Sequence, residues 1–150
     1  MRFIPTATIA SAFFFATSGA LAQFARIGFP TEGASVPAGS TLSVDVVRPL
    51  FDAQGNVIVS SEVGIVLGIT SCPTNPQDCI DPAKTLGTML YNGDFYPVFG
   101  DGAEPNVNIT IQIPDDTPKG AAQLNLGHFF LLGAEFSPQV ESSSVKITIV

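Results

Sequence analysis

Apolar and polar residues alternate along several stretches of the chain. The clearest stretch is 106–113, where every second residue is Val or Ile and the residues between them are Asn, Thr and Gln. Successive side chains of a β-strand point to opposite faces of a sheet, so this period of two predicts a strand with one buried and one exposed face. Pro114 ends the pattern, because proline cannot donate a hydrogen bond to a neighbouring strand.

Segments of the same kind, separated by turns rich in Gly and Pro, predict about seven strands. The predicted strands span residues 24–29, 41–47, 57–69, 85–91, 106–113, 121–132 and 144–150. Helix signals are nearly absent. We therefore expect an all-β fold, and the strand count favours an immunoglobulin-like (Greek-key) β-sandwich over a barrel. The Cys-Trp-Cys core of antibody domains is missing, because the chain contains no Trp.

The longest apolar segment, 57–69, carries more apolar residues than one face of a strand needs. Apolar residues also occupy part of its second face, which indicates a central strand, or a pair of strands with a bulge near Ser60 and Ser61. In the following strand, Leu86 and Leu90 are expected to point inward. The predicted core face of the long segment consists of Val57, Val59, Val63, Ile65, Leu67 and Ile69.

The first 22 residues predict a secretory signal peptide. A short basic start is followed by an apolar run and then by Ala20-Leu21-Ala22, the small-x-small pattern before a cleavage site. The apolar run is too short and too interrupted to span a membrane, and no later segment approaches that length. We expect residues 23–150 to form one secreted, extracellular β-sandwich domain.

The mature chain is predicted to be strongly acidic. Loss of Arg2 with the signal peptide leaves five basic and thirteen acidic residues, and so a formal charge of −8. Such a surface repels phosphate backbones and anionic lipid headgroups. Nucleic acid and membranes are therefore disfavoured as partners.

Two cysteines, Cys72 and Cys79, are expected to form a disulfide outside the cell. The bridge closes a short loop, so we expect it to add only about 2 kcal/mol to the free energy of unfolding. Its expected role is to hold this loop rather than the whole domain. Redox-active pairs usually have the spacing Cys-x-x-Cys beside a helix, which is not the spacing here.

His128 is the only histidine of the chain. Catalysis by this residue needs a nucleophile and an orienting carboxylate, and a metal site needs several further ligands at suitable spacing. Neither pattern is present in the sequence. We therefore favour a hydrogen-bonded structural histidine within a strand, and predict no catalytic, metal or cofactor site.

The acidic residues do not form a catalytic or calcium-binding pattern either. Asp115 and Asp116 lie in a predicted turn, where adjacent carboxylates rarely flank a glycosidic bond. Asp94, Asp101 and Glu104 lie in a Gly-rich loop without a known calcium-loop spacing, which favours a solvated acidic loop.

Asn108-Ile109-Thr110 is an N-glycosylation sequon. Asn108 lies on the polar face of its predicted strand, and export makes it accessible to the glycosylation machinery. The sequence therefore predicts a glycan at Asn108.

Four aromatic residues within nine positions mark the loop that follows residue 91: Tyr91, Phe95, Tyr96 and Phe99. Aromatic side chains on a loop provide a large contact area at modest entropic cost, which suits a protein-binding patch. The equally weighted alternative is that these rings fold back over the end of the sandwich.

Several segments in this order resemble the necrosis-inducing secreted protein effectors of plant-associated fungi. The resemblance covers nearly the whole mature chain, although no single motif is specific. Its segments are Ile27-Gly28-Phe29-Pro30, Val36-Pro37-Ala38-Gly39, Glu62 to Ile69, Leu86-Gly87, Tyr91-Asn92-Gly93, Asn108 to Pro114, Thr117-Pro118-Lys119-Gly120 and Leu131-Leu132-Gly133-Ala134.

The resemblance implies a non-enzymatic effector that binds host immune-receptor kinases and dampens plant immunity. It maps no contact residues onto this chain. The alternative is a fungal cell-wall or carbohydrate-binding module, although the row of exposed aromatic residues that usually stacks on sugar rings is weak here. A hydrolase is disfavoured by the missing triad.

Overall fold

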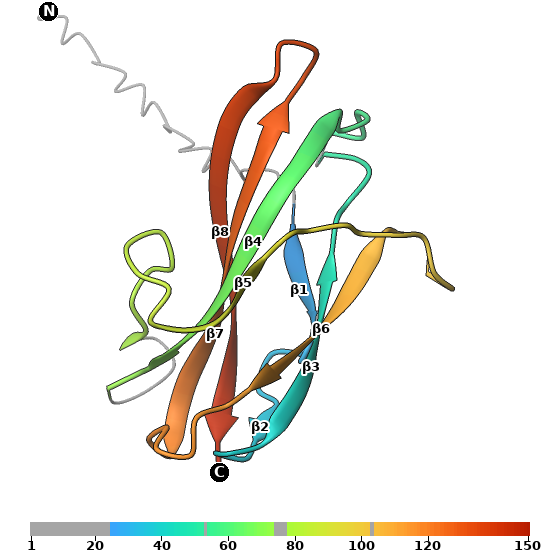
Figure 1. Cartoon of the computed structure of the whole chain (residues 1–150). Coiled ribbons are helices and arrows are strands. Elements are labelled where there is room, and N and C mark those ends of the chain that lie inside the picture. Colours follow the sequence, from blue (N-terminus) through green and yellow to red (C-terminus); the bar gives the residue numbers. More distant parts are fainter. Residues whose placement is uncertain (1–24, 53, 74–77, 103) are drawn as a thin grey trace, which may run out of the picture.

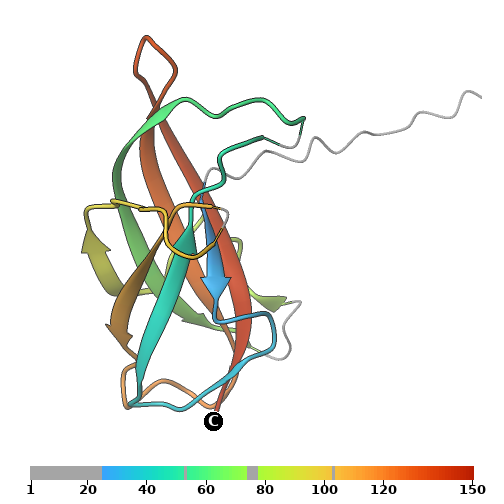
Figure 2. The ribbon, with the colours of Figure 1, turned by 90° about the vertical axis from the view of Figure 1, so that its right-hand side faces the viewer.

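The computed structural model describes residues 25–52, 54–73, 78–102 and 104–150 and shows two β-sheets packed face to face (Figures 1 and 2). One sheet has the order β1-β3-β6, from strands Arg26–Phe29, Thr41–Val47 and Asn106–Gln112. The other has the order β2-β8-β7-β4-β5, from strands Ser35–Val36, Ser137–Ile149, Gly120–Leu132, Ser60–Ser71 and Thr88–Gly93. The predicted signal peptide, residues 1–22, lies outside the described residues.

The predicted all-β sandwich is confirmed. The chain passes from one sheet to the other after β1, β2, β3, β5 and β6, and only β4–β5 and β7–β8 are sequence neighbours within a sheet. Strands that follow one another in the chain are therefore mostly separated in space, which is the connectivity expected of a Greek-key sandwich.

The core lies between the two sheets and is built by the alternating residues. Val44 and Val46 of β3 face Leu124 and Leu126 of β7 across the sandwich interior, and all four side chains are fully buried. Each inner face thus removes a continuous apolar row from water, at roughly 25 cal/mol per Å² of buried apolar surface. This burial is the main force that holds the two sheets together.

The alternate residues of the longest apolar segment, 57–69, do not all face the core. The prediction that they do is wrong for the first half of the segment. A β-bulge lies between Glu62 and Gly64, two residues beyond the position considered in the sequence. The extra residue reverses which face each side chain takes. Val63, at the bulge, and Val57 and Val59, in the chain before β4, are exposed rather than buried.

Several strand boundaries also differ from the predicted ones. The strand predicted from residue 85 begins at Thr88, and Leu86 lies outside any strand. The last strand begins at Ser137, seven residues earlier than predicted, because its polar first half pairs along the whole of β7. Ser35–Val36 forms an additional short strand parallel to β8.

Leu86 belongs to a segment, 80–87, that covers the outer face of the five-stranded sheet. Two buried side chains of β7 hold it there: the Gln123 side-chain amide donates to the Ile80 carbonyl (3.0 Å), and the Asn125 amide donates to the Leu86 carbonyl (3.1 Å). Cys72 and Cys79 are joined by the predicted disulfide just before this segment.

Gly68 of β4 allows segment 80–87 to approach the sheet. A Cβ atom at this position would lie 2.2 Å from the Leu86 carbonyl oxygen, far inside van der Waals contact. Gly68→Ala is therefore expected to lower the free energy of unfolding by about 1–3 kcal/mol, as overpacking does. Urea unfolding would measure this, with Gly100→Ala as control, because a Cβ on Gly100 meets nothing within 4 Å. Equal stability of the two variants would contradict the prediction.

Among the described residues no helix is long and apolar enough to cross a membrane.

Candidate functional site

Four charged side chains meet at one end of the sandwich interior. Glu62 accepts a hydrogen bond from Arg48 (Nε to Oε1, 2.6 Å), and its second oxygen lies 2.5 Å from Nε2 of His128. Nδ1 of His128 lies 2.9 Å from Oε1 of Glu141. The imidazole therefore lies between two carboxylates, and the arginine closes one end of the row. We call these four residues the ionic cluster.

The bulge in β4 and the register of β7 with β8 assemble the ionic cluster. The bulge sets the register in which Glu62 pairs with Phe130, a buried residue of β7, and partners in a ladder share a face, so Glu62 points to the interior. His128 and Glu141 are direct partners in the β7–β8 ladder, so their side chains leave the sheet on the same face. Arg48, immediately after β3, reaches the cluster from the opposite sheet.

The guanidinium of Arg48 is held by several further acceptors. One terminal nitrogen donates to the Ile58 carbonyl (3.2 Å) and to the Ser60 hydroxyl (2.7 Å), and that hydroxyl in turn donates to Glu62 (2.8 Å). Side chains of Arg48 and Glu62 are only about a tenth exposed. Charges this far from water are tolerated because each is paired and hydrogen-bonded.

Two phenylalanine rings enclose the imidazole of His128. Phe130 stacks on it with ring centroids 4.7 Å apart, and Phe95 meets it edge-on at 5.3 Å. His128 and Phe95 are both fully buried. Since both ring nitrogens face carboxylates and no edge reaches the surface, this geometry favours the structural role that the sequence suggested for His128.

The ionic cluster shifts the pKa values of two of its members. Burial alone would lower the pKa of His128, but hydrogen bonds to Glu141 and Glu62 outweigh it and raise this pKa above its ordinary value. Burial would raise the pKa of Glu62, but hydrogen bonds from His128, Arg48 and Ser60 lower it below its ordinary value. Both shifts favour the charged forms.

These shifts predict a stability maximum in mildly acidic solution. A raised His128 pKa stabilises the fold below about 6.5, and this is lost as the pH rises through the folded-state value. A lowered Glu62 pKa stabilises the fold above about 4.5, and this is lost as the pH falls. Urea unfolding measured at a series of pH values should therefore give its highest midpoint between about pH 4.5 and pH 6.5. A midpoint that rises steadily above pH 6.5 would contradict the prediction.

The structure divides the four aromatic residues of the candidate binding loop. Phe95 is a core residue, so its assignment to a protein-binding surface is wrong in this structure. Tyr91, in β5, is partly buried against the core, and its hydroxyl donates to the Asp94 carbonyl (3.2 Å). Tyr96 and Phe99 are about two-thirds exposed. Each of the two alternatives weighed in the sequence thus holds for part of the loop.

A groove of about 570 Å³ lies between this loop and the chain that enters β4. Its floor contains the buried Phe95 and parts of Arg48 and Glu62, and its edges include Tyr96 and Phe99. Further lining residues are Leu50, Ser60, Ser61, Pro97 and Pro105. The ionic cluster and the exposed aromatic residues therefore belong to one place on the molecule.

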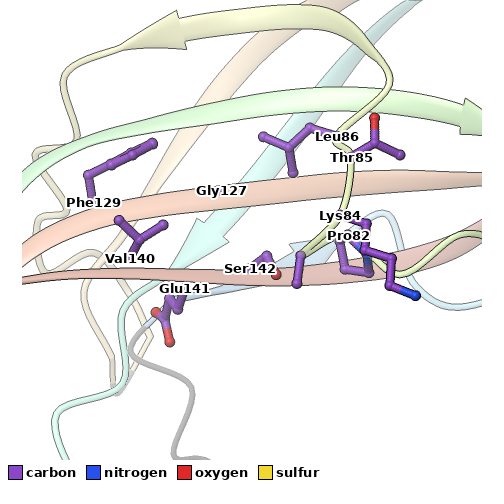
Figure 3. Close-up of a pocket in the computed structure, with 10 residues that line it drawn as sticks. Pro82, Lys84, Thr85, Leu86, Gly127, Phe129, Val140, Glu141 and Ser142 are labelled. Atoms are coloured by element: carbon purple, nitrogen blue, oxygen red, sulfur yellow. The ribbon is translucent and has the colours of Figure 1, made fainter.

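A second groove, of about 420 Å³, lies on the outer face of the five-stranded sheet. Figure 3 shows Phe129 and Val140 side by side at one end and Leu86 with Thr85 at the other. Glu141 points away from this groove, consistent with its hydrogen bond to His128 on the inner face.

The acidic residues considered in the sequence remain apart from the ionic cluster. Asp115 and Asp116 are exposed in the turn before β7, and Glu104 forms an ion pair with Arg26. Asp94 and Asp101 are exposed. Within the described ranges, no group of three or more His, Cys, Asp or Glu side chains is arranged to hold a metal ion.

Asn108 is exposed on β6, one of the two edge strands of the three-stranded sheet. If the secreted chain is glycosylated there, digestion with an N-glycosidase should lower its mass by one glycan. Asn108→Gln should then already have the lower mass, while Asn106→Gln, outside any sequon, should not. An unchanged mass after digestion of the unaltered chain would contradict the prediction.

Sequence reasoning identified His128 but not its charged partners. The signal that could have found them is Glu62, a glutamate within the longest apolar segment, because a carboxylate in a buried strand needs a partner. Nothing in the local pattern connects it with Arg48 or Glu141.

One family model, that of the Nis1 family, matches residues 20–148 of the 150. No curated protein matches the chain.

Proposed function

Because this chain belongs to the Nis1 family, an effector family, we propose that it is a secreted, non-enzymatic effector that binds receptor-associated kinases of a plant host. The family match supports the effector part of this proposal. The kinase partner and the dampening of plant immunity come from the resemblance to necrosis-inducing secreted effectors.

The observation that carries the proposal is a set of exposed apolar side chains on the two loops that form the first groove, of which Tyr96 and Phe99 line it; we call this set the apolar rim. Its six side chains are all more than half exposed: Phe51, Val57, Val59, Tyr96, Val98 and Phe99. The rim comes from two loops, since Phe51 pairs with Val57, and Val98 pairs with Asn106. A cluster of this kind costs solubility in a monomer and is typical of a protein-binding surface.

The proposal is tested by capturing host kinases from plant tissue with the tagged, secreted chain. We expect receptor-associated kinases to be enriched, and the burst of reactive oxygen that follows a microbial elicitor to be reduced in tissue expressing the chain. Phe99→Ser should weaken both effects, whereas Met89→Ser, an equally exposed site on β5 away from the rim, should not.

The result that would overturn the proposal is an absence of kinase enrichment together with a normal oxidative burst. Retention of the chain on chitin or glucan in a polysaccharide pull-down, without kinase capture, would instead support the carbohydrate-binding alternative.

A further inference from the structure

We propose that the groove between the two loops is a receptor for one aromatic side chain of a partner polypeptide, flanked in that partner by lysine or arginine. This inference rests on the proposed function only in taking the ligand to be a polypeptide. It adds the chemistry of the ligand, for which three features of the groove provide the argument.

The first feature is the size and lining of the groove. A volume of about 570 Å³ lies within the range of roughly 300–1,000 Å³ typical of ligand pockets. Its walls are mainly apolar, with Leu50, Pro97 and Pro105 beside the exposed rings of Tyr96 and Phe99. Such walls favour a large apolar side chain, and two exposed rings allow edge or face contacts with a third.

The second feature is the guanidinium of Arg48 at the floor. Hydrogen bonds to Glu62, Ser60 and the Ile58 carbonyl hold it in place before any ligand arrives. A fixed guanidinium presents a flat cationic face, on which aromatic rings stack favourably. The ion pair with Glu62 compensates its charge, so the floor does not repel a basic peptide as a free arginine would.

The third feature is the sign of the charges around the groove. The loops that line it also carry Asp52, Asp94 and Asp101, and none of these forms an ion pair within the described part of the chain. These carboxylates do not line the groove, and that of Asp52 accepts hydrogen bonds from Gln54 and Asn56 of its own turn, but all three lie within two positions of lining residues. Arg26, on β1, is already paired with Glu104. Acidic loops beside an apolar groove favour an apolar ligand with basic neighbours.

The lysines lie elsewhere on the molecule. The groove lies at the end of the sheet where Ser60 pairs with Leu132. Lys119 lies at the opposite end, because it precedes Gly120, which pairs with Ile149. Lys146 pairs with Gln123 toward that same far end, and Lys84 lines the outer-face groove. Figure 2 shows the end with the C-terminus separated from the loop that leads into β4. The outer-face groove, with a lysine on its border, does not share this charge pattern.

The test is a titration of the isotope-labelled, secreted chain with a short synthetic peptide that has one tryptophan between two pairs of lysines, followed by NMR. We expect amide shift changes at Ser60, Ser61, Glu62, Tyr96 and Phe99. Two matched peptides, one with glutamates for the lysines and one with alanine for the tryptophan, should each bind at least about tenfold more weakly.

Variants assign the binding to the groove. Tyr96→Ser and Asp101→Asn should each weaken binding of the lysine–tryptophan peptide several-fold, and Asp101→Asn should also reduce its salt dependence. Val140→Ser, an exposed apolar site in the outer-face groove, should leave binding unchanged and serves as the matched control.

Three results would overturn the inference: no shift changes, shift changes centred on Phe129 and Val140, or equal binding of all three peptides. A fourth result would also overturn the inference: amide shifts at the rim that change with protein concentration in the absence of peptide. Such shifts would identify a second copy of the chain as the occupant of the groove. Peptide binding does not require a kinase, so it can succeed while kinase capture fails, and the two proposals are tested separately.

Discussion

Replacing Glu62 with alanine is expected to lower the free energy of unfolding by about 3–5 kcal/mol. Both oxygens of this carboxylate are engaged, one by Arg48 and Ser60 and the other by His128. The substitution would leave the guanidinium with little compensating charge in a mostly buried position. It would also remove one of the two carboxylates that hold the buried imidazole.

Chemical unfolding with urea, followed by the intrinsic fluorescence of tyrosine, measures this loss. Glu135→Ala is the matched control, because Glu135 is exposed in the β7–β8 turn and should change stability by no more than about 0.5 kcal/mol. Glu62→Gln tests the contribution of the negative charge alone. The amide keeps the size of the side chain but is not the anion that Arg48 and His128 require. A stability of Glu62→Ala equal to that of the control would show that the ionic cluster contributes nothing net.

Replacing Phe95 with alanine is expected to cost a similar amount, about 3–5 kcal/mol. Phe95 is the largest of the fully buried side chains, and its ring meets the imidazole of His128 edge-on. Its removal would leave a cavity beside the ionic cluster and free the start of the loop that carries Tyr96 and Phe99. We therefore expect weaker partner binding as well as lower stability.

Phe99→Ala is the control for stability, because it removes the same side chain from an exposed position of the same loop. It should leave the unfolding midpoint nearly unchanged while weakening partner binding. The two variants thus separate the buried anchor of the loop from its exposed contact residue. A large stability loss in Phe99→Ala, or none in Phe95→Ala, would contradict this division of roles.

The period-two pattern predicted the strands where one face is apolar and the other polar. Strand 106–113 is the best example, since Ile109, Ile111 and Ile113 are buried and Asn108 and Thr110 are exposed. The prediction failed where the pattern is apolar on both faces. Val57, Val59 and Val63 are as apolar as core residues but exposed: Val63 lies at the bulge in β4, and Val57 and Val59 lie in the chain before that strand.

The candidate site was less accessible to sequence reasoning. Phe95 and Phe99 are chemically identical and four residues apart, yet one is fully buried and the other is about two-thirds exposed. The difference arises because Phe95, two residues after the end of β5, turns into the interior beside His128. Nothing in the loop sequence distinguishes the two rings.

Local information was sufficient for the fold class, the disulfide and the acidic surface, because strand period, cysteine spacing and charge are properties of short segments or of composition. The ionic cluster required the tertiary structure, since Arg48, Glu62, His128 and Glu141 come from four separate parts of the chain. The groove and its rim required it for the same reason. Their residues become neighbours only when two sheets pack together, and the energy of that packing depends on contacts between distant positions, which no local pattern records.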